Sequence, residues 1–200
     1  RLHGCQYAII PDMIEAGSYM VAAAATGGEL TIENVIPKHL EAITNKLVEM
    51  GAEVEDLDDA VVVRAGKAIR PAIIKTLPYP GFPTDMNPQF AVLEALATEP
   101  GNGQIQETIY KNRFRYIEEL KRMGANAEYE NDTARFVGVP LLDGARVRAV
   151  DLRAGMAMVI AGLAASGETH IEDAFHIARG YDHVVEKLHA VGAMIFAEGR

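Results

Sequence analysis

The sequence predicts an α/β (α+β) fold in which buried helices are surrounded by sheets, with pseudo-threefold symmetry. The first observation is a threefold pattern: Asp at 12, 85 and 151, Gly sixteen residues later at 28, 101 and 167, and a basic residue at 39, 113 and 179. The second is one helix per copy that is apolar on almost every face, which is typical of a buried helix. The third is strands that alternate between apolar and polar residues, which indicates one face in contact with water.

Each copy contains two predicted helices of different character. The first is the apolar helix, at 20–25, 90–97 and 156–165. The second is amphipathic, with apolar stripes at Leu40, Ile43, Leu47 and Met50, at Ile117, Leu120 and Met123, and at Val184, Val185, Leu188 and Val191. A glycine follows each stripe, at 51, 124 and 192, and is typical of a helix C-terminus.

The predicted strands lie between and after these helices. Leu30 and Ile32, Ile105, and Ile171 alternate with polar neighbours, and a further strand is expected over 7–10. Each unit therefore follows the order helix, strand, helix, strand and further strand. We expect one domain, 1–200, built from repeats at about 5–70, 71–140 and 141–200 that share one core.

Composition excludes several classes of protein. Nineteen basic and 28 acidic residues give a net charge of −9, which argues against a nucleic-acid partner. The longest nearly apolar run, 154–165, is too short to cross a bilayer, so no membrane partner is expected. The six histidines lack metal-ligand spacing, the single Cys5 permits no internal disulfide, and no glycine-rich nucleotide motif occurs. We expect no metal, no cofactor and a cytoplasmic location, with Cys5 as a structural or incidental residue.

The three aspartates precede the apolar helices, where Asp commonly caps a helix. Capping is therefore one interpretation of Asp12, Asp85 and Asp151. The surroundings of Asp85 favour a second one, because Pro80, Gly81, Pro83 and Pro88 restrict the chain around it. Such rigidity suits a positioned carboxylate that acts as a general base or a ligand.

The basic residues His39, Arg113 and Arg179 are each expected to open the second helix of their unit. A cation is disfavoured at this positive end of the helix dipole, and a bound anion would make it favourable. A phosphate or carboxylate site is one interpretation, and pairing with an internal carboxylate is the alternative. Asp151 and Arg153 could likewise form an internal ion pair or line a cleft.

Several motifs together carry a resemblance to a known family. They are 10–17 (IPDMIEAG), 79–86 (YPGFPTDM), 107–114 (ETIYKNRF), 151–154 (DLRA) and 179–181 (RGY). With them the chain resembles the C-terminal half of the UDP-N-acetylglucosamine 1-carboxyvinyltransferases, enolpyruvyl transferases that begin peptidoglycan synthesis. The resemblance extends over essentially all 200 residues.

The resemblance implies a two-domain, inside-out α/β barrel-like architecture with three β-α-β-α-β-β units per domain. It implies transfer of enolpyruvate from phosphoenolpyruvate to the 3′-hydroxyl of UDP-N-acetylglucosamine, with release of phosphate. By motif, Asp85 matches a proposed catalytic base beside that hydroxyl. Thr84 belongs to the same signature, and the resemblance implies that both residues bind substrate. Ile109 matches a residue that contacts the nucleotide sugar through its backbone. The remaining matches are Arg113 and Arg179, which face phosphoenolpyruvate, and Asp151 and Arg153, which line the interdomain cleft.

Two alternative functions stay open. The first is the sister enzyme that acts on shikimate 3-phosphate, and the second is a non-catalytic module of the same fold. The chain starts without Met and lacks the half in which the family carries its cysteine loop, so we expect a fragment that is inactive alone. Its partners would be the two substrates and the other half of the same enzyme.

Overall fold

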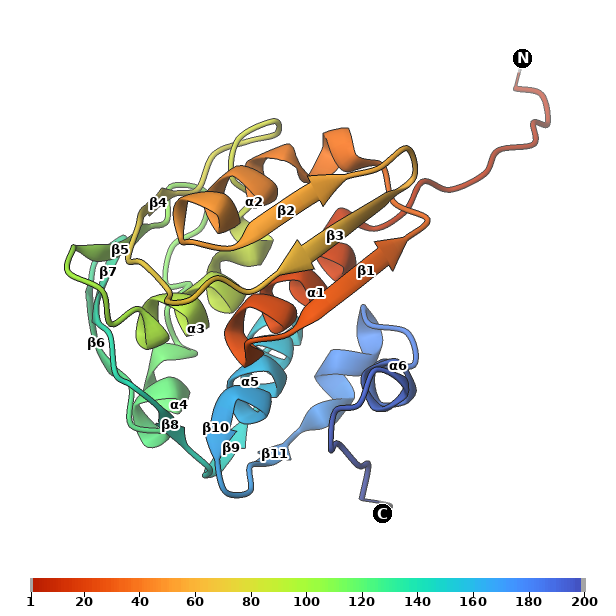
Figure 1. Ribbon diagram of the computed structural model, residues 1–200. Helices are drawn as coiled ribbons and strands as arrows, with labels where there is room; N and C mark the ends of the chain where they lie inside the picture. The colour runs from red at the N-terminus through yellow and green to blue at the C-terminus, as the bar shows by residue number, and fades with distance from the viewer. Residues whose placement is uncertain (1, 199–200) are drawn as a thin grey trace.

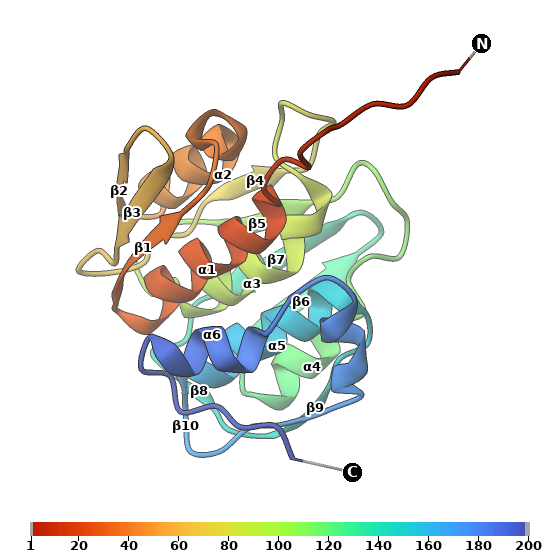
Figure 2. The ribbon, with the colours of Figure 1, turned by 90° about the vertical axis from the view of Figure 1, so that its right-hand side faces the viewer.

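A computed structural model describes residues 2–198 and has three helices at its centre. They are α1 (Met13–Thr26), α3 (Asn87–Leu96) and α5 (Leu152–Ala164), and each contacts the other two. Figures 1 and 2 show strands and further helices arranged around this trio. The predicted arrangement of helices inside and sheets outside is confirmed.

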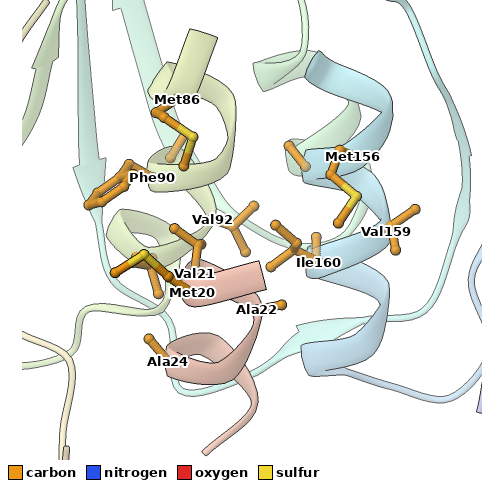
Figure 3. Packing of buried hydrophobic residues seen from close by; sticks show 14 of the residues in the cluster. Met20, Val21, Ala22, Ala24, Met86, Phe90, Val92, Met156, Val159 and Ile160 are labelled. Carbon is orange, nitrogen blue, oxygen red and sulfur yellow. The ribbon is translucent and has the colours of Figure 1, made fainter. Parts of the chain in front are cut away.

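The facing sides of the three central helices form one apolar core. Met20 on α1, Phe90 on α3 and Ile160 on α5 have no exposed surface, and Figure 3 shows such side chains converging between the helices. On another side of α1, Gly17 allows a close approach of the helix α2 (Pro37–Glu49), because a Cβ at Gly17 would lie 2.7 Å from Cδ1 of Ile43. The core therefore depends on small and apolar residues on every face of these helices, as the sequence predicts.

The second helices are α2 (Pro37–Glu49), α4 (Ile117–Arg122) and α6 (Val184–Ala190). All three end in the same way: the backbone N–H groups of Ala52, Ala125 and Ala193 donate to the carbonyls of Leu47, Leu120 and Leu188. The preceding glycines have φ between 88° and 107°, the left-handed region that a Schellman ending requires. The predicted helix ends are confirmed, and they repeat in detail.

The predicted apolar stripe of the third unit is only partly correct. The stripes of α2 and α4 are buried, but on α6 only Leu188 is buried and Val191 is 58% exposed. The strands that follow α2 and α4 pack against them, whereas no strand follows α6 within residues 2–198. The order helix, strand, helix, strand therefore holds for two units and stops at α6 in the third.

The sheets repeat as well. Strands β1 (Glu29–Glu33), β2 (Glu53–Asp56) and β3 (Ala60–Arg64) form an antiparallel sheet in the order β1-β3-β2. The second unit forms the order β4-β5-β7-β6 from β4 (Ile73–Lys75), β5 (Gly103–Gln106), β6 (Asn126–Glu130) and β7 (Thr133–Val137). Two short parallel pairs complete the set, β8 (Leu142–Asp143) with β10 (Ala165–Ser166) and β9 (Arg146–Arg148) with β11 (His170–Glu172). The parallel pair β4-β5 matches β9-β11, and β1-β3-β2 matches β5-β7-β6.

The strand expected over 7–10 is a wrong prediction. Residues 2–12 form neither helix nor strand, are exposed, and extend away from the body in Figure 1. No strand in the described part of the chain lies beside them, and a strand needs a neighbour to satisfy its backbone groups. Over the whole described range, residues 2–198, no helix is long and apolar enough to cross a membrane.

Candidate active site

Asp85 lies in a short 3-10 turn that the sequence does not predict. The loop before it closes on itself, because the Leu77 N–H donates to the Phe82 carbonyl at 2.9 Å. The 3-10 turn η1 (Thr84–Met86) follows, and α3 begins only at Asn87. Asp85 is therefore not the N-cap of α3, which corrects the capping interpretation at this position. Its carboxylate is free for other partners.

Those partners are two arginines from different segments. Nη2 of Arg113 lies 2.8 Å from Oδ1 of Asp85, and Nε of Arg153 lies 3.2 Å from Oδ2. The Asp85 side chain is 36% exposed, while those of Arg113 and Arg153 are 20% and 14% exposed. The three residues, which we call the Asp85 cluster, form a carboxylate held between two guanidinium groups at a partly open position.

Arg153 enters this cluster from the first turn of α5. Asp151 caps this helix by accepting hydrogen bonds from the backbone N–H groups of Arg153 at 2.9 Å and Ala154 at 2.8 Å. The side chain of Arg153 turns toward Asp85 instead, and its guanidinium carbon lies 5.6 Å from the ring centroid of Tyr181. Asp151 and Arg153 had two interpretations, an internal ion pair or the lining of a cleft. The structure does not show an ion pair between them. The buried Nη1 of Arg153 has no hydrogen-bond partner within residues 2–198.

Tyr181 supports Arg153 from a buried polar cluster between the central helices. Its hydroxyl lies 2.8 Å from Oγ of Ser18, and Nε2 of Gln89 donates to it at 3.1 Å. Burial raises the pKa of Tyr181 above its ordinary value, so the phenol is neutral at physiological pH. The arginine therefore rests on a fixed aromatic ring beneath the open site.

The prediction that Arg113 and Arg179 each open a helix is wrong. Arg113 lies in a turn four residues before α4, and its guanidinium carbon is 5.2 Å from the ring centroid of Tyr110. The adjacent Asn112 has φ of 58°, in the left-handed region, so the backbone just before Arg113 is not α-helical. Arg179 is the last residue of the 3-10 helix η2 (Ala174–Arg179), five residues before α6. It is exposed and forms no ion pair in the described part of the chain.

His39 does lie in the first turn of its helix, but apart from the Asp85 cluster. It lines a cavity of about 250 Å³ together with Lys38, Tyr79 and Pro83. Its ring packs edge-on against that of Tyr79, with 6.3 Å between the centroids. Among residues 2–198, no group of three or more His, Cys, Asp or Glu side chains could hold a metal ion.

Glu107 is the site residue to which sequence reasoning assigned no role. It follows β5, is 2% exposed, and accepts hydrogen bonds from Thr84 Oγ1 at 2.7 Å and Asn87 Nδ2 at 3.0 Å. It also accepts from the backbone N–H groups of Ile109 and Tyr110 at 2.8 and 3.1 Å. Burial alone would raise the pKa of Glu107, but these hydrogen bonds outweigh it and lower the pKa below its ordinary value. Glu107 is therefore a charged, buried carboxylate.

Two predicted site residues, Thr84 and Ile109, lie close together because both donate hydrogen bonds to Glu107. Thr84 precedes Asp85 directly, and Ile109 is four residues before Arg113. The Ile109 side chain is at the surface, and its N–H group is occupied by Glu107. The structure thus unites Thr84, Asp85, Ile109, Arg113 and Arg153, while Asp151 and Arg179 form no hydrogen bond or ion pair with Asp85 within residues 2–198.

Comparison with known proteins places this chain in a family. Residues 1–188 match the family model of EPSP synthase (3-phosphoshikimate 1-carboxyvinyltransferase). A UDP-N-acetylglucosamine 1-carboxyvinyltransferase from Desulfofundulus thermocisternus is 54% identical over 196 residues, which are 98% of this chain and 80% of that protein. The chain belongs to the UDP-N-acetylglucosamine 1-carboxyvinyltransferase family.

Other members of this family are longer. UDP-N-acetylglucosamine 1-carboxyvinyltransferase 3 from Caldanaerobacter subterraneus is 58% identical over 195 residues, 98% of this chain but 46% of that protein. The chain spans about half the length of such relatives and corresponds to their C-terminal half. The resemblance inferred from the motifs is therefore confirmed.

A solved structure extends the comparison to the fold. The enolpyruvyl transferase NikO from Streptomyces tendae superposes with a TM-score of 0.82 at 29% identity, over 92% of this chain and 44% of that one. The inside-out arrangement of helices and sheets is thus shared with an enolpyruvyl transferase.

Proposed function

We propose that this chain is one of two domains of an enzyme that transfers enolpyruvate from phosphoenolpyruvate to the 3′-hydroxyl of UDP-N-acetylglucosamine, with release of phosphate. This reaction would be the first committed step of peptidoglycan synthesis. The single observation that carries the proposal is the Asp85 cluster, a carboxylate and two guanidinium groups at a partly open position, in a chain of this family.

In this proposal Asp85 is the base that accepts the proton of the attacking hydroxyl. Its carboxylate lies between Arg113 and Arg153, at 2.8 Å from Nη2 of Arg113 and 3.2 Å from Nε of Arg153. The phosphate of phosphoenolpyruvate competes with Asp85 for Arg113, because guanidinium binds phosphate as readily as carboxylate. Exchange of Arg113 from Asp85 to the phosphate then leaves the carboxylate free to take the proton.

The other residues bind and enclose the substrates. Thr84 and the backbone of Ile109 contact the nucleotide sugar, Arg179 contacts phosphoenolpyruvate, and Asp151 with Arg153 lines the cleft between the domains. Arg179 suits this role because it is exposed and has no internal ion pair among the described residues to give up. The other half of the enzyme supplies the opposite wall, which excludes water and orients both substrates.

The reaction proceeds by addition and elimination. Asp85 takes the proton of the 3′-hydroxyl as the 3′-oxygen bonds to C2 of phosphoenolpyruvate, and the electron pair of the C2–C3 double bond takes up a proton at C3 from an acid of the complete enzyme. In the second step C3 returns a proton to the conjugate base of that acid, the C2–C3 double bond forms again, and the bond from C2 to the phosphate oxygen breaks. The departing phosphate carries away the proton held by Asp85. We place the reaction in the cytoplasm, which suits the unpaired Cys5, an exposed thiol.

The experiment is an acceptor comparison with the complete enzyme. We expect phosphate release from phosphoenolpyruvate when UDP-N-acetylglucosamine is added and none when shikimate 3-phosphate replaces it. Release with shikimate 3-phosphate alone would assign the sister activity named by the family model. Release with neither acceptor would favour the non-catalytic module.

A further inference from the structure

Glu107 receives hydrogen bonds from five donors and holds a buried charge without any arginine or lysine. Oε1 accepts from Thr76 Oγ1 at 3.0 Å and from the Ile109 and Tyr110 N–H groups, and Oε2 accepts from Thr84 and Asn87. No ion pair to Glu107 is found within residues 2–198. Burying a carboxylate is costly unless its oxygens are fully hydrogen-bonded, and here they are.

These donors come from three separate segments that meet at the site. Thr76 follows β4, Thr84 and Asn87 flank Asp85, and Ile109 begins the turn that carries Arg113. The Asn87 amide is fixed from its other side, because the Tyr116 hydroxyl donates to its carbonyl oxygen. Among residues 2–198, the carboxylate is the one side-chain group bonded to all three segments, so its position sets the distance between the Asp85 turn and the Arg113 turn.

An amide could not replace this carboxylate. All five partners donate, and a Gln side chain has one accepting oxygen and an NH2 group that accepts nothing. The threonine hydroxyls could reverse their role and accept, but the Asn87 NH2 and the backbone N–H groups cannot. Whichever way the amide is turned, its NH2 therefore faces at least one obligate donor, either Asn87 Nδ2 on the Asp85 side or the N–H groups of Ile109 and Tyr110 on the other.

We propose that Glu107 is the positioning residue of the site: its carboxylate fixes the Thr84–Asp85 turn against the Ile109–Arg113 turn in the arrangement that turnover needs. The inference rests on the proposed function.

The test is Glu107→Gln in the complete enzyme, with Glu119→Gln as the matched control. Glu119 is also buried, at 7% exposure, and its side chain also accepts from a backbone N–H, that of Arg148 at 3.0 Å, but within residues 2–198 it forms no hydrogen bond or ion pair with Asp85 or with the donors to Glu107. Both variants are assayed well below their melting temperatures. A misplacement of about 1 Å in a reacting group costs roughly a hundredfold in rate. We therefore expect kcat/KM for the nucleotide sugar to fall by about ten- to a hundredfold in Glu107→Gln and to stay within about twofold in Glu119→Gln.

A second variant covers the case in which Glu107→Gln does not fold. Thr76→Val keeps the shape of the side chain but removes one donor to Glu107 from the side away from Asp85. We expect it to lower kcat/KM for the nucleotide sugar by a few-fold, about three- to tenfold. The proposal is overturned if folded Glu107→Gln keeps kcat/KM within twofold of the wild type. If only Thr76→Val can be assayed, the proposal is overturned when that variant keeps kcat/KM within twofold of the wild type. An inactive wild-type enzyme removes the proposed function and this inference together, whereas an active one with a normal Glu107→Gln variant removes only the inference.

Discussion

Replacing Asp85 by Asn in the complete enzyme is expected to stop most turnover and to leave the fold intact. Asn keeps the shape of the side chain, and its oxygen can still accept a hydrogen bond from Arg113 or Arg153. It cannot take up a proton from the sugar hydroxyl. Loss of a general base costs about 10²–10⁴ in rate, which is the fall in kcat that we expect.

The effect on stability should be much smaller. The Asp85 side chain is 36% exposed, and ion pairs at such positions contribute about 0–1 kcal/mol each. One kcal/mol corresponds to about 2–4 °C in melting temperature for a domain of this size, so we expect a shift of a few degrees. Phosphate release measures the first effect, and calorimetry of the same samples measures the second.

Asp12→Asn is the matched control. Asp12 occupies the same position in the first repeat and caps α1 by accepting from the Ile14 N–H at 2.7 Å. Asn caps a helix about as well as Asp, so both stability and turnover should stay close to the wild type. The catalytic assignment is refuted if Asp85→Asn retains turnover within about threefold of the wild type, as general-base loss should cost far more.

Three further predictions follow from the same geometry. Arg113→Ala and Arg179→Ala in the complete enzyme should each reduce kcat/KM for phosphoenolpyruvate by about ten- to a hundredfold, which is the cost of a lost contact to a charged group. Only Arg113→Ala should also lower the melting temperature, because Arg113 pairs with Asp85 whereas Arg179 has no ion pair among the described residues. If both variants lose stability and keep their kinetics, the arginines have only a structural role. The isolated chain should give a cooperative melt by circular dichroism but no phosphate release, and measurable release would contradict the need for two walls. Burial raises the pKa of Glu94 from 4.5 to about 8, so its stabilising contribution is present below about pH 4.5 and is lost as the pH rises through about 8. Glu94→Gln should therefore gain stability relative to the wild type between pH 5 and pH 8 in urea unfolding, and a constant difference would show that Glu94 is not protonated in the fold.

The sequence predicted the parts of the fold that depend on local pattern. An apolar helix such as α5 can only be buried, whatever surrounds it, and the glycines at 51, 124 and 192 mark helix ends because few other residues adopt positive φ. The strand over 7–10 could not be judged in this way. A strand exists only with a neighbour, and pairing is not a local property.

The candidate site was predicted in its residue types but not in its contacts. The 3-10 turn at Thr84 shifts the start of α3 by two residues beyond Asp85, and local pattern places helix starts only to within such a margin. The contact between Asp85 and Arg153 joins residues 68 positions apart in two repeats. Glu107 is charged, and charged residues are rarely buried, so only the structure reveals that it is the common partner of both turns.

The central claim is that the Asp85 cluster is the reaction centre, and a crystal structure of the complete enzyme with UDP-N-acetylglucosamine and a phosphoenolpyruvate analogue tests it most directly. The account predicts that the Asp85 carboxylate lies within hydrogen-bond distance of the sugar 3′-hydroxyl and that Arg113 has exchanged Asp85 for the phosphate. It is contradicted if the sugar binds elsewhere while Arg113 and Arg153 both remain on Asp85, at the 2.8 and 3.2 Å described above.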